Sequence, residues 1–341
     1  MGHTPNVTPK GMMAMEYRPL GNTGLMVSAV SFGTWAIGGA WGPVDRDEAL
    51  RGLHRAIEAG VNFFDTADIY GDGKSEELLR EATKGREDEI YIATKFCRSL
   101  DIHDPETYSE RTVRRLCEAS LKRLGRERID LYQIHCPPHE IIKRGDVFQV
   151  LDRLQQEGKI RFYGVSVETV DEGLTALQYP GVRALQVIFN IFRQKPLAEL
   201  FPKAQAQGVG ILARLPLASG LLTGKFTKDT TFPPDDHRNY NRDGQYFNVG
   251  ETFAGLPFEK GVELADKLRW IADGRPSMAA AALRWILSFD AVSCVIPGFK
   301  NARQVEDNLR ALEARPFDKE ELARLERFYR EEVHQHIRGA Y

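Results

Sequence analysis

Several features that would place this chain in a special class are scarce or missing. Its four cysteines are scattered without Cys-x-x-Cys spacing, which suggests reduced thiols in a cytosolic protein. The 48 acidic residues nearly cancel the 46 lysines and arginines, so the charge balance indicates no surface for nucleic acid or membrane. No segment approaches the roughly 20 apolar residues that a membrane span needs. The apolar content of 42%, with 28% charged residues, is that of a soluble globular protein.

The N-terminus also lacks the apolar core of a signal peptide. We expect residues 1–14 to be a flexible extension. The rest of the 341-residue chain contains no linker and no low-complexity block. Residues 15–341 are therefore predicted to form a single domain, which we expect to be cytoplasmic.

Eight short runs rich in β-branched and aromatic residues recur along the chain. Most of them alternate poorly between apolar and polar residues, as expected of parallel strands buried on both faces. Helical patterns such as 47–60 and 109–125 lie between them. The runs are VSAVSFG, VNFFD, EIYIATK, DLYQIH, RFYGVS, ALQVIFN, GILAR and VSCVIPG, starting at 27, 61, 89, 130, 161, 184, 210 and 292. This order predicts an α/β fold of the (β/α)₈ TIM-barrel type.

The chain is longer than the roughly 250 residues of a typical eight-unit barrel, and the additional residues lie in a few segments. Residues 17–28 predict an N-terminal β-hairpin that turns at Asn22-Thr23-Gly24 and covers the barrel floor. The polar, proline-containing stretch 226–250 lies between the seventh and eighth strands and predicts a long loop that could act as a lid. Two helices follow this loop, and a further C-terminal helix is predicted at 318–333.

Titratable side chains stand at the carboxyl ends of three successive predicted strands. Asp65, Lys95 and His135 end the second, third and fourth strands, and Tyr70 lies in the loop after the second. In a parallel barrel these strand ends form the catalytic face. We therefore predict that the four side chains converge on one active site.

The chemistry that suits this set is proton donation by a phenol. A free tyrosine has a pKa of about 10, and a neighbouring ammonium group favours the phenolate. We expect Lys95 to lower the pKa of Tyr70 and Asp65 to keep the lysine charged. His135 could orient a substrate oxygen. Because none of these groups carries a hydride, a hydride-carrying cofactor is implied.

These motifs resemble those of a known family. FFDTADIYGDGKSEELL, IATK and DLYQIH, in this order, are similar to motifs of the aldo-keto reductases, including a bacterial branch that also resembles channel β subunits. The similarity extends from about Tyr17 to Asn308. It implies NADPH-dependent reduction of an aldehyde or ketone, with Tyr70 as the general acid, Lys95 and Asp65 as its partners and His135 as the substrate-orienting residue.

The resemblance also implies where the dinucleotide would bind, across the top of the barrel. Lys300 and Arg303 suit the 2′-phosphate of NADPH, so we expect NADPH in preference to NADH. Arg238, in the long loop, could close over the phosphates. The implied cofactor residues are Gly33, Thr34, Trp35, Ser166, Gln186, Arg214, Leu217, Gly220, Lys225, Arg238, Gly298, Lys300, Gln304, Asp307 and Asn308.

Two positions depart from the family pattern. Val167 stands where many relatives have an asparagine that binds the carboxamide of the nicotinamide. Arg214 stands where many relatives stack a tyrosine on the nicotinamide. A guanidinium can stack on a flat ring, but its charge disfavours the oxidised, cationic form of the cofactor. We hypothesise that Arg214 biases the site toward the reduced cofactor.

Two other functions remain open at this point. A metal-dependent hydrolase also places Asp and His at barrel strand ends, and His135 and His139 flank Cys136 and two prolines. The chain lacks the paired His-x-His expected on the first strand of such enzymes, and we expect no metal. A cofactor-sensing regulatory subunit of the same fold is the second alternative. The presence of all four catalytic-type residues favours an enzyme acting on a small carbonyl substrate.

Overall fold

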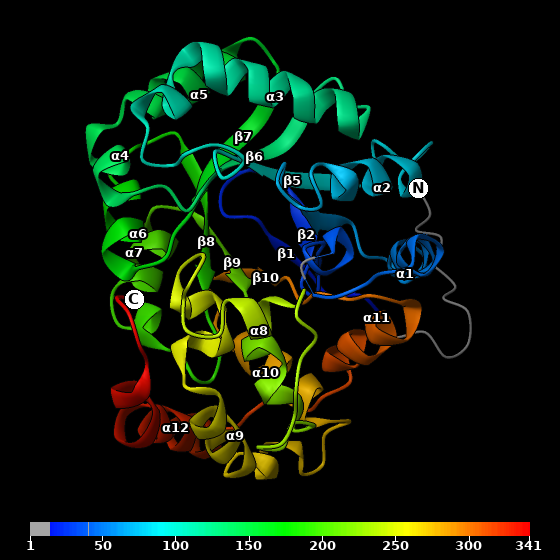
Figure 1. Cartoon of the computed structure of the whole chain (residues 1–341), viewed down its shortest axis with the longest axis vertical. Helices are drawn as coiled ribbons and strands as arrows, with labels where there is room; N and C mark the ends of the chain where they lie inside the picture. The colour runs from blue at the N-terminus through cyan, green and yellow to red at the C-terminus, as the bar shows by residue number, and fades with distance from the viewer. Residues whose placement is uncertain (1–13, 40) are drawn as a thin grey trace, which may run out of the picture.

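The fold is a parallel β-barrel surrounded by helices (Figure 1), as predicted. The computed structural model describes residues 14–39 and 41–341. The predicted extension, residues 1–14, lies outside the described residues except for its last position. Within the part of the chain that the structure describes, no helix combines the length and apolarity needed to cross a bilayer.

Eight parallel strands make up the barrel in the order in which they occur along the chain. Single parallel bridges from Val30 to Val295 and from Gly33 to Gly298 join its first and last strands. The strands are β3 (Phe32–Gly33), β4 (Phe63–Asp65), β5 (Tyr91–Phe96), β6 (Ile129–His135), β7 (Ile160–Ser166), β8 (Val182–Ile188), β9 (Gly210–Arg214) and β10 (Val292–Val295). Their carboxyl ends therefore meet at one rim, which is where a TIM barrel carries its active site.

The predicted N-terminal hairpin is present as β1 (Tyr17–Pro19) and β2 (Met26–Ser28). The run that we predicted to be the first barrel strand starts at residue 27, and its first two residues belong to β2 of the hairpin. Only Phe32–Gly33 of this run forms a barrel strand. The reason is packing: Leu20, Leu25 and Val27 are buried in the apolar cluster inside the barrel. As predicted, the hairpin covers the barrel floor, opposite the catalytic rim.

Helices surround the strands, and capping residues determine where these helices begin and end. The Asp45 side chain accepts a hydrogen bond from the Glu48 amide and begins one helix, while Ser109 and Gly125 delimit another. The helices are α1 (Arg46–Glu58), α2 (Lys74–Ala82), α3 (Glu110–Leu124), α4 (His139–Arg144), α5 (Asp146–Gln156), α6 (Val170–Ala176), α7 (Leu200–Ala206), α8 (His237–Tyr240), α9 (Phe258–Asp266), α10 (Met278–Ile286), α11 (Ala302–Leu309) and α12 (Lys319–Phe328).

The long loop after β9 packs onto the rim of the barrel. Asp236 of this loop forms an antiparallel bridge with Trp41, and the Lys300 ammonium donates to the Trp41 carbonyl oxygen. Farther along the loop, the Phe253 amide donates to the Ser219 hydroxyl at 3.0 Å. The loop includes α8 and the short 3₁₀ helix η5 (Val249–Glu251). It thus brings residues of the region 226–257 to the catalytic face.

Candidate active site

The four predicted catalytic residues lie together at the carboxyl ends of β4, β5 and β6. The Lys95 ammonium lies 2.5 Å from Asp65 Oδ1 and donates to the Tyr70 hydroxyl at 3.2 Å. The His135 ring contacts the edge of the Tyr70 ring, with 5.8 Å between centroids. Lys95 is fully buried and Asp65 nearly so. The arrangement is a chain of polar contacts from a buried carboxylate through an ammonium to a phenol.

Two side-chain amides hold the second carboxylate oxygen of Asp65. Gln133 and Gln186 donate to Asp65 Oδ2 at 3.0 Å and 2.8 Å. We expected Gln186 to contact the cofactor, and we did not single out Gln133. The signal for Gln133 was present in the motif DLYQIH, because residues two apart on a strand point to the same side, and His135 points inward. With both amides in place, every oxygen of the buried carboxylate has a hydrogen-bond donor.

The pKa values of the lysine and the tyrosine follow from burial and mutual contact. Burial works against the Lys95 ammonium, but Asp65 and Tyr70 outweigh it, so the pKa of Lys95 lies above its ordinary value. Burial raises the pKa of Tyr70 as well, and the Lys95 ammonium offsets only part of this rise. The prediction of a net lowered pKa for Tyr70 is therefore wrong, because desolvation of the phenolate exceeds the attraction of the lysine. The phenol holds its proton at neutral pH.

His135 is a neutral imidazole. Burial, together with the positive charges of Arg98 and Lys95, holds the pKa of His135 well below its usual range. Its Nδ1 atom is buried and has no hydrogen-bond partner among the described residues. A neutral ring with a free nitrogen can orient a substrate oxygen without adding charge to the site.

The loop that carries Tyr70 is braced from the strand before it. Ser75 donates to Thr34 Oγ1 at 2.6 Å, and the Thr34 hydroxyl in turn donates to the Asp65 carbonyl. Gly38 lies against the backbone of Tyr70, where an added Cβ would come within 2.9 Å of the Tyr70 carbonyl carbon. Trp35 lies parallel to the Tyr70 ring, with 6.2 Å between centroids. These contacts fix the position of the phenol.

One cavity of about 350 Å³ joins the catalytic residues to most of the predicted cofactor residues. Asp65, Tyr70 and His135 form part of its wall. The cofactor residues that line it are Gly33, Trp35, Gln186, Arg214, Leu217, Gly220, Lys225, Arg238, Gly298, Lys300, Gln304, Asp307 and Asn308. The wall combines glycines, which permit close approach of a ligand, with polar and basic groups, as an elongated phosphate-containing ligand requires.

Two predicted cofactor residues, Thr34 and Ser166, do not line this cavity, and neither does Val167, which departs from the family pattern. Thr34 is fully buried behind the wall, where it braces the Tyr70 loop. Ser166 is buried with its hydroxyl 3.3 Å from the Cys136 sulfur. Val167 is also buried, and its amide donates to the Gln186 carbonyl at 2.9 Å. In this structure their side chains support the wall rather than form it.

At the other end of the cavity, α11 begins with an ordered cap. The Asn301 side chain accepts from the Gln304 amide, and the Gln304 side chain accepts from the Lys300 amide. The Lys300 ammonium is directed to the Trp41 carbonyl, whereas Arg303 is exposed and does not line the cavity. Lys300 is thus the basic group at this end that lies on the cavity wall.

Arg238 lies on the cavity wall within the long loop. Its guanidinium makes two hydrogen bonds to the Asp236 carboxylate, at 2.9 Å and 2.5 Å. It also lies over the rings of Phe232 and Trp41, at 4.4 Å and 4.9 Å from their centroids. Arg238 therefore lies on the cavity wall with much of its charge already balanced by Asp236, and its closure over the phosphates stays a prediction.

A second group of buried charges, which the sequence did not indicate, lies next to the catalytic residues. We call Arg98, Glu168, Arg214 and Glu251 the charge network. Arg98 Nη2 lies 2.9 Å from Glu168 and 2.6 Å from Glu251. Arg214 lies 3.1 Å from Glu168 and 3.9 Å from Glu251. Arg214, which we expected to present an isolated charge to the nicotinamide, is therefore paired with two carboxylates.

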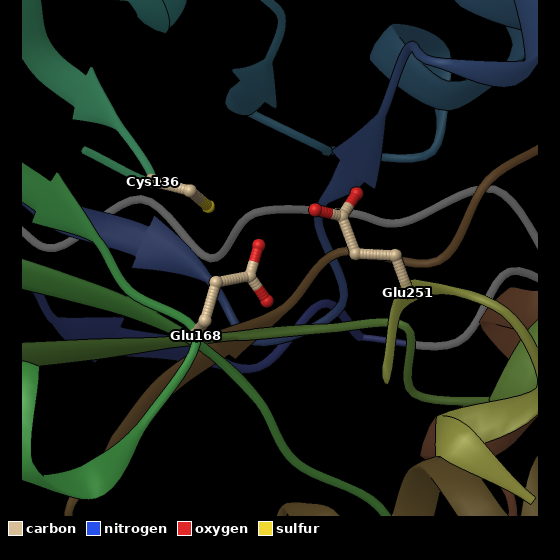
Figure 2. Close-up of side chains that lie close together, drawn as sticks. All are labelled: Cys136, Glu168 and Glu251. Carbon is tan, nitrogen blue, oxygen red and sulfur yellow. The ribbon is translucent and has the colours of Figure 1, made fainter. Parts of the chain in front are cut away.

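The thiol of Cys136 lies beside these two carboxylates, and all three groups point toward one another (Figure 2). Such a set could bind a metal ion in another setting. Here the carboxylates are already paired with the guanidinium groups of Arg98 and Arg214, whose positive charges repel a cation. Burial also raises the pKa of Cys136, which keeps the sulfur protonated. The set is better described as part of the charge network than as a metal centre.

Comparisons with known proteins agree with this geometry. The model of the Aldo/keto reductase family matches residues 29–330. The chain is 32% identical over 298 residues to "Aldo-keto reductase YhdN" of Bacillus subtilis, covering 86% of this chain and 87% of that protein. It is 32% identical over 333 residues to "L-galactose dehydrogenase" of Arabidopsis thaliana, covering 92% and 94%.

Among solved structures, the glycerol dehydrogenase AKR11B4 from Gluconobacter oxydans superposes with a TM-score of 0.76 at 30% identity. The superposition covers 96% of this chain and 99% of that one. The family match, the barrel and the strand-end residues therefore all agree. The chain belongs to the aldo/keto reductase family of NAD(P)H-dependent oxidoreductases.

Proposed function

We propose that this enzyme reduces an aldehyde or ketone to the alcohol with NADPH, reversibly, by direct hydride transfer, and that Tyr70 supplies the proton. The single observation that carries this proposal is the contact chain Asp65–Lys95–Tyr70, with distances of 2.5 Å and 3.2 Å, at the wall of a cavity. It supports the proposal because the protonated phenol lies at the cavity wall, beside a cation that would stabilise the phenolate.

The nicotinamide, when bound, supplies the hydride to the carbonyl carbon. This chain's residues handle the oxygen. Tyr70 donates its proton to the developing alkoxide, and Lys95 stabilises the phenolate that remains. Asp65 keeps Lys95 charged and in place, and neutral His135 donates a hydrogen bond that orients the substrate oxygen. General acid catalysis of this kind is worth about 10²- to 10⁴-fold.

The residues present fit a dinucleotide. Arg214 Nε and His135 Nδ1 are buried at the cavity wall without hydrogen-bond partners among the described residues, so polar groups remain available to a ligand. Gln186 and Arg214 would hold the nicotinamide end, and Leu217 would lie under the pyrophosphate. At the adenosine end, Lys300 on the cavity wall supports NADPH over NADH, because a 2′-phosphate would give its ammonium a partner of opposite charge.

We further propose that residues 15–341 act as one catalytic domain. A reducing compartment such as the cytoplasm is supported by four buried cysteines that form no disulfide. The complete set of Asp65, Tyr70, Lys95 and His135 disfavours a purely cofactor-sensing role. The names of the two dehydrogenase relatives make polyols and sugars the first compounds to test, in a panel of carbonyls and alcohols monitored by NADPH absorbance.

The decisive experiment is Tyr70→Phe. We expect turnover to fall by about 10²-fold or more, while the dissociation constant of NADPH changes little. Tyr91→Phe is a matched control. Tyr91 is the first residue of β5, the strand that also carries Lys95, and it does not line the cavity. Normal turnover in Tyr70→Phe would refute the assignment of the general acid.

A further inference from the structure

The charge network joins parts of the chain that are far apart in sequence. Arg98 follows β5 and Glu168 follows β7, while Arg214 ends β9. Glu251 comes from η5 in the long loop. Glu251 is therefore the only member of the network that the long loop supplies, and it reaches the network only when that loop is docked on the rim.

Glu251 also faces the site of the reaction. It lines the cavity together with Arg214, Tyr70 and His135. It is almost fully buried, with an exposed fraction of 5%, so its charge is poorly screened by water. One of its oxygens is 2.6 Å from Arg98, and the other faces Arg214 at 3.9 Å. A change in its charge would therefore be felt at the cavity.

The charges of the network balance when both carboxylates are ionised. Two guanidinium groups, Arg98 and Arg214, face two carboxylates, Glu168 and Glu251. Without Glu251, two positive charges would face one negative charge beside the cavity. The nicotinamide of NADP⁺ is cationic, whereas that of NADPH is neutral. An excess positive charge at this wall would therefore weaken NADP⁺ binding and leave NADPH binding less affected.

We propose that Glu251 is a specificity-determining residue for the oxidation state of the cofactor: docked with the long loop, it neutralises Arg214 and allows NADP⁺ to bind alongside NADPH. This inference rests on the proposed nucleotide site. It replaces the expectation that Arg214 by itself biases the site toward the reduced cofactor. The positive charge of Arg214 alone would favour the reduced cofactor, and the Glu251 carboxylate from the long loop offsets this preference.

The test measures binding of each nucleotide alone, without turnover, at a pH of about 8.5, where Glu168, whose pKa is raised to about 7, is ionised. Trp35 and Trp41 line the cavity, so quenching of tryptophan fluorescence reports the dissociation constants of NADP⁺ and NADPH. In Glu251→Gln we expect the ratio of the NADP⁺ constant to the NADPH constant to rise roughly ten-fold, as one uncompensated charge at reduced dielectric screening implies. Glu321→Gln is the control, because Glu321 is also paired with a buried arginine, Arg275, at 2.7 Å and does not line the cavity.

A second variant separates charge from docking of the loop. The double variant Glu251→Gln/Arg98→Gln still lacks the ionic link between loop and rim, but Arg214 and Glu168 then balance each other. We expect its ratio to return to within about three-fold of wild type. If Glu251 only fastened the loop, both dissociation constants would rise together in the single variant, and the double variant would not restore the ratio.

The outcomes are distinct from a failure of the proposed function. If neither nucleotide binds to the wild-type protein, the nucleotide site itself is wrong. If both bind and the ratio is the same in wild type and Glu251→Gln, the nucleotide site stands and the role of Glu251 is refuted. A raised ratio in Glu251→Gln that is reversed in the double variant supports the inference.

Discussion

Two groups of buried charges border one cavity, and they are assembled in different ways. Asp65 and Lys95 belong to neighbouring strands, β4 and β5, whose register pairs Asp65 with Ala93, two residues before the lysine. The charge network instead combines three rim segments with a residue of the long loop, Glu251. The first group is fixed as soon as the barrel forms, whereas the second is complete only when the loop docks.

The difference teaches what each group can do. A proton donor must keep the same surroundings in every turnover, and Tyr70 obtains this from Lys95 on a barrel strand. A group of charges that responds to loop docking needs a residue that moves away with the loop, as Glu251 would. We therefore infer that the strand-borne pair serves the chemistry and that the network serves the discrimination between NADP⁺ and NADPH. The predictions below test whether the two groups differ in this way.

The largest effect is expected for Lys95→Met. Asp65 would remain buried with only amide partners, and breaking a buried ion pair in this way costs about 3–5 kcal/mol of the free energy of unfolding. Turnover should fall as far as in Tyr70→Phe, since the phenolate loses its cation. Urea unfolding and NADPH oxidation measure the two effects. A loss of turnover without a loss of stability would contradict the view that the Asp65–Lys95 pair is a fixed part of the folded barrel.

A smaller cost is expected for Arg98→Met, although Arg98 pairs with two carboxylates. Burial and the nearby Glu251 raise the pKa of Glu168 to about 7, so this group can take up a proton when an arginine is lost. Arg214 would then balance Glu251 alone. We expect a loss of about 1–2 kcal/mol in urea unfolding at pH 7, within the usual range for a point substitution. A cost equal to that of Lys95→Met would abolish the distinction between the two groups.

The sequence predicted the strand-borne group well because barrel strands have a fixed direction. Once Asp65, Lys95 and His135 stood at the ends of successive strands, the parallel order placed them on one rim. The eight strands, the floor hairpin and the long loop were confirmed. The split of the first predicted strand was missed, because the run 27–33 has no glycine or proline before Gly33 to show where the hairpin ends.

The loop-borne group could not be predicted in the same way. Glu168 and Glu251 lie in segments without strand or helix periodicity, and only tertiary packing brings them together. The net pKa of Tyr70 was also missed, because desolvation depends on how many atoms surround the phenol. The strand order predicts that Lys95 lies near Tyr70, but it does not predict how completely water is excluded from the two side chains.

The last prediction concerns the pH dependence that Glu168 gives to the stability of the protein. Its ordinary pKa of 4.5 is raised to about 7 in the folded protein, first by burial and then by Glu251. The unfolded chain therefore releases this proton at lower pH than the folded one. The stability that Glu168 contributes is complete below pH 4.5 and is lost as the pH rises through 7.

Glu168→Gln should remove this dependence. We expect the variant to gain about 1–3 kcal/mol relative to wild type between pH 5 and pH 8, measured as free energies of urea unfolding. The other charged groups around Glu168 do not titrate in this interval. Arg98 and Arg214 stay protonated, and these same two guanidinium groups hold the pKa of Glu251 well below its usual range against the effect of burial. A difference that stays constant with pH would mean that Glu168 is ionised throughout. The network would then be as fixed in charge as the Asp65–Lys95 pair, and its response to loop docking would depend on Glu251 alone.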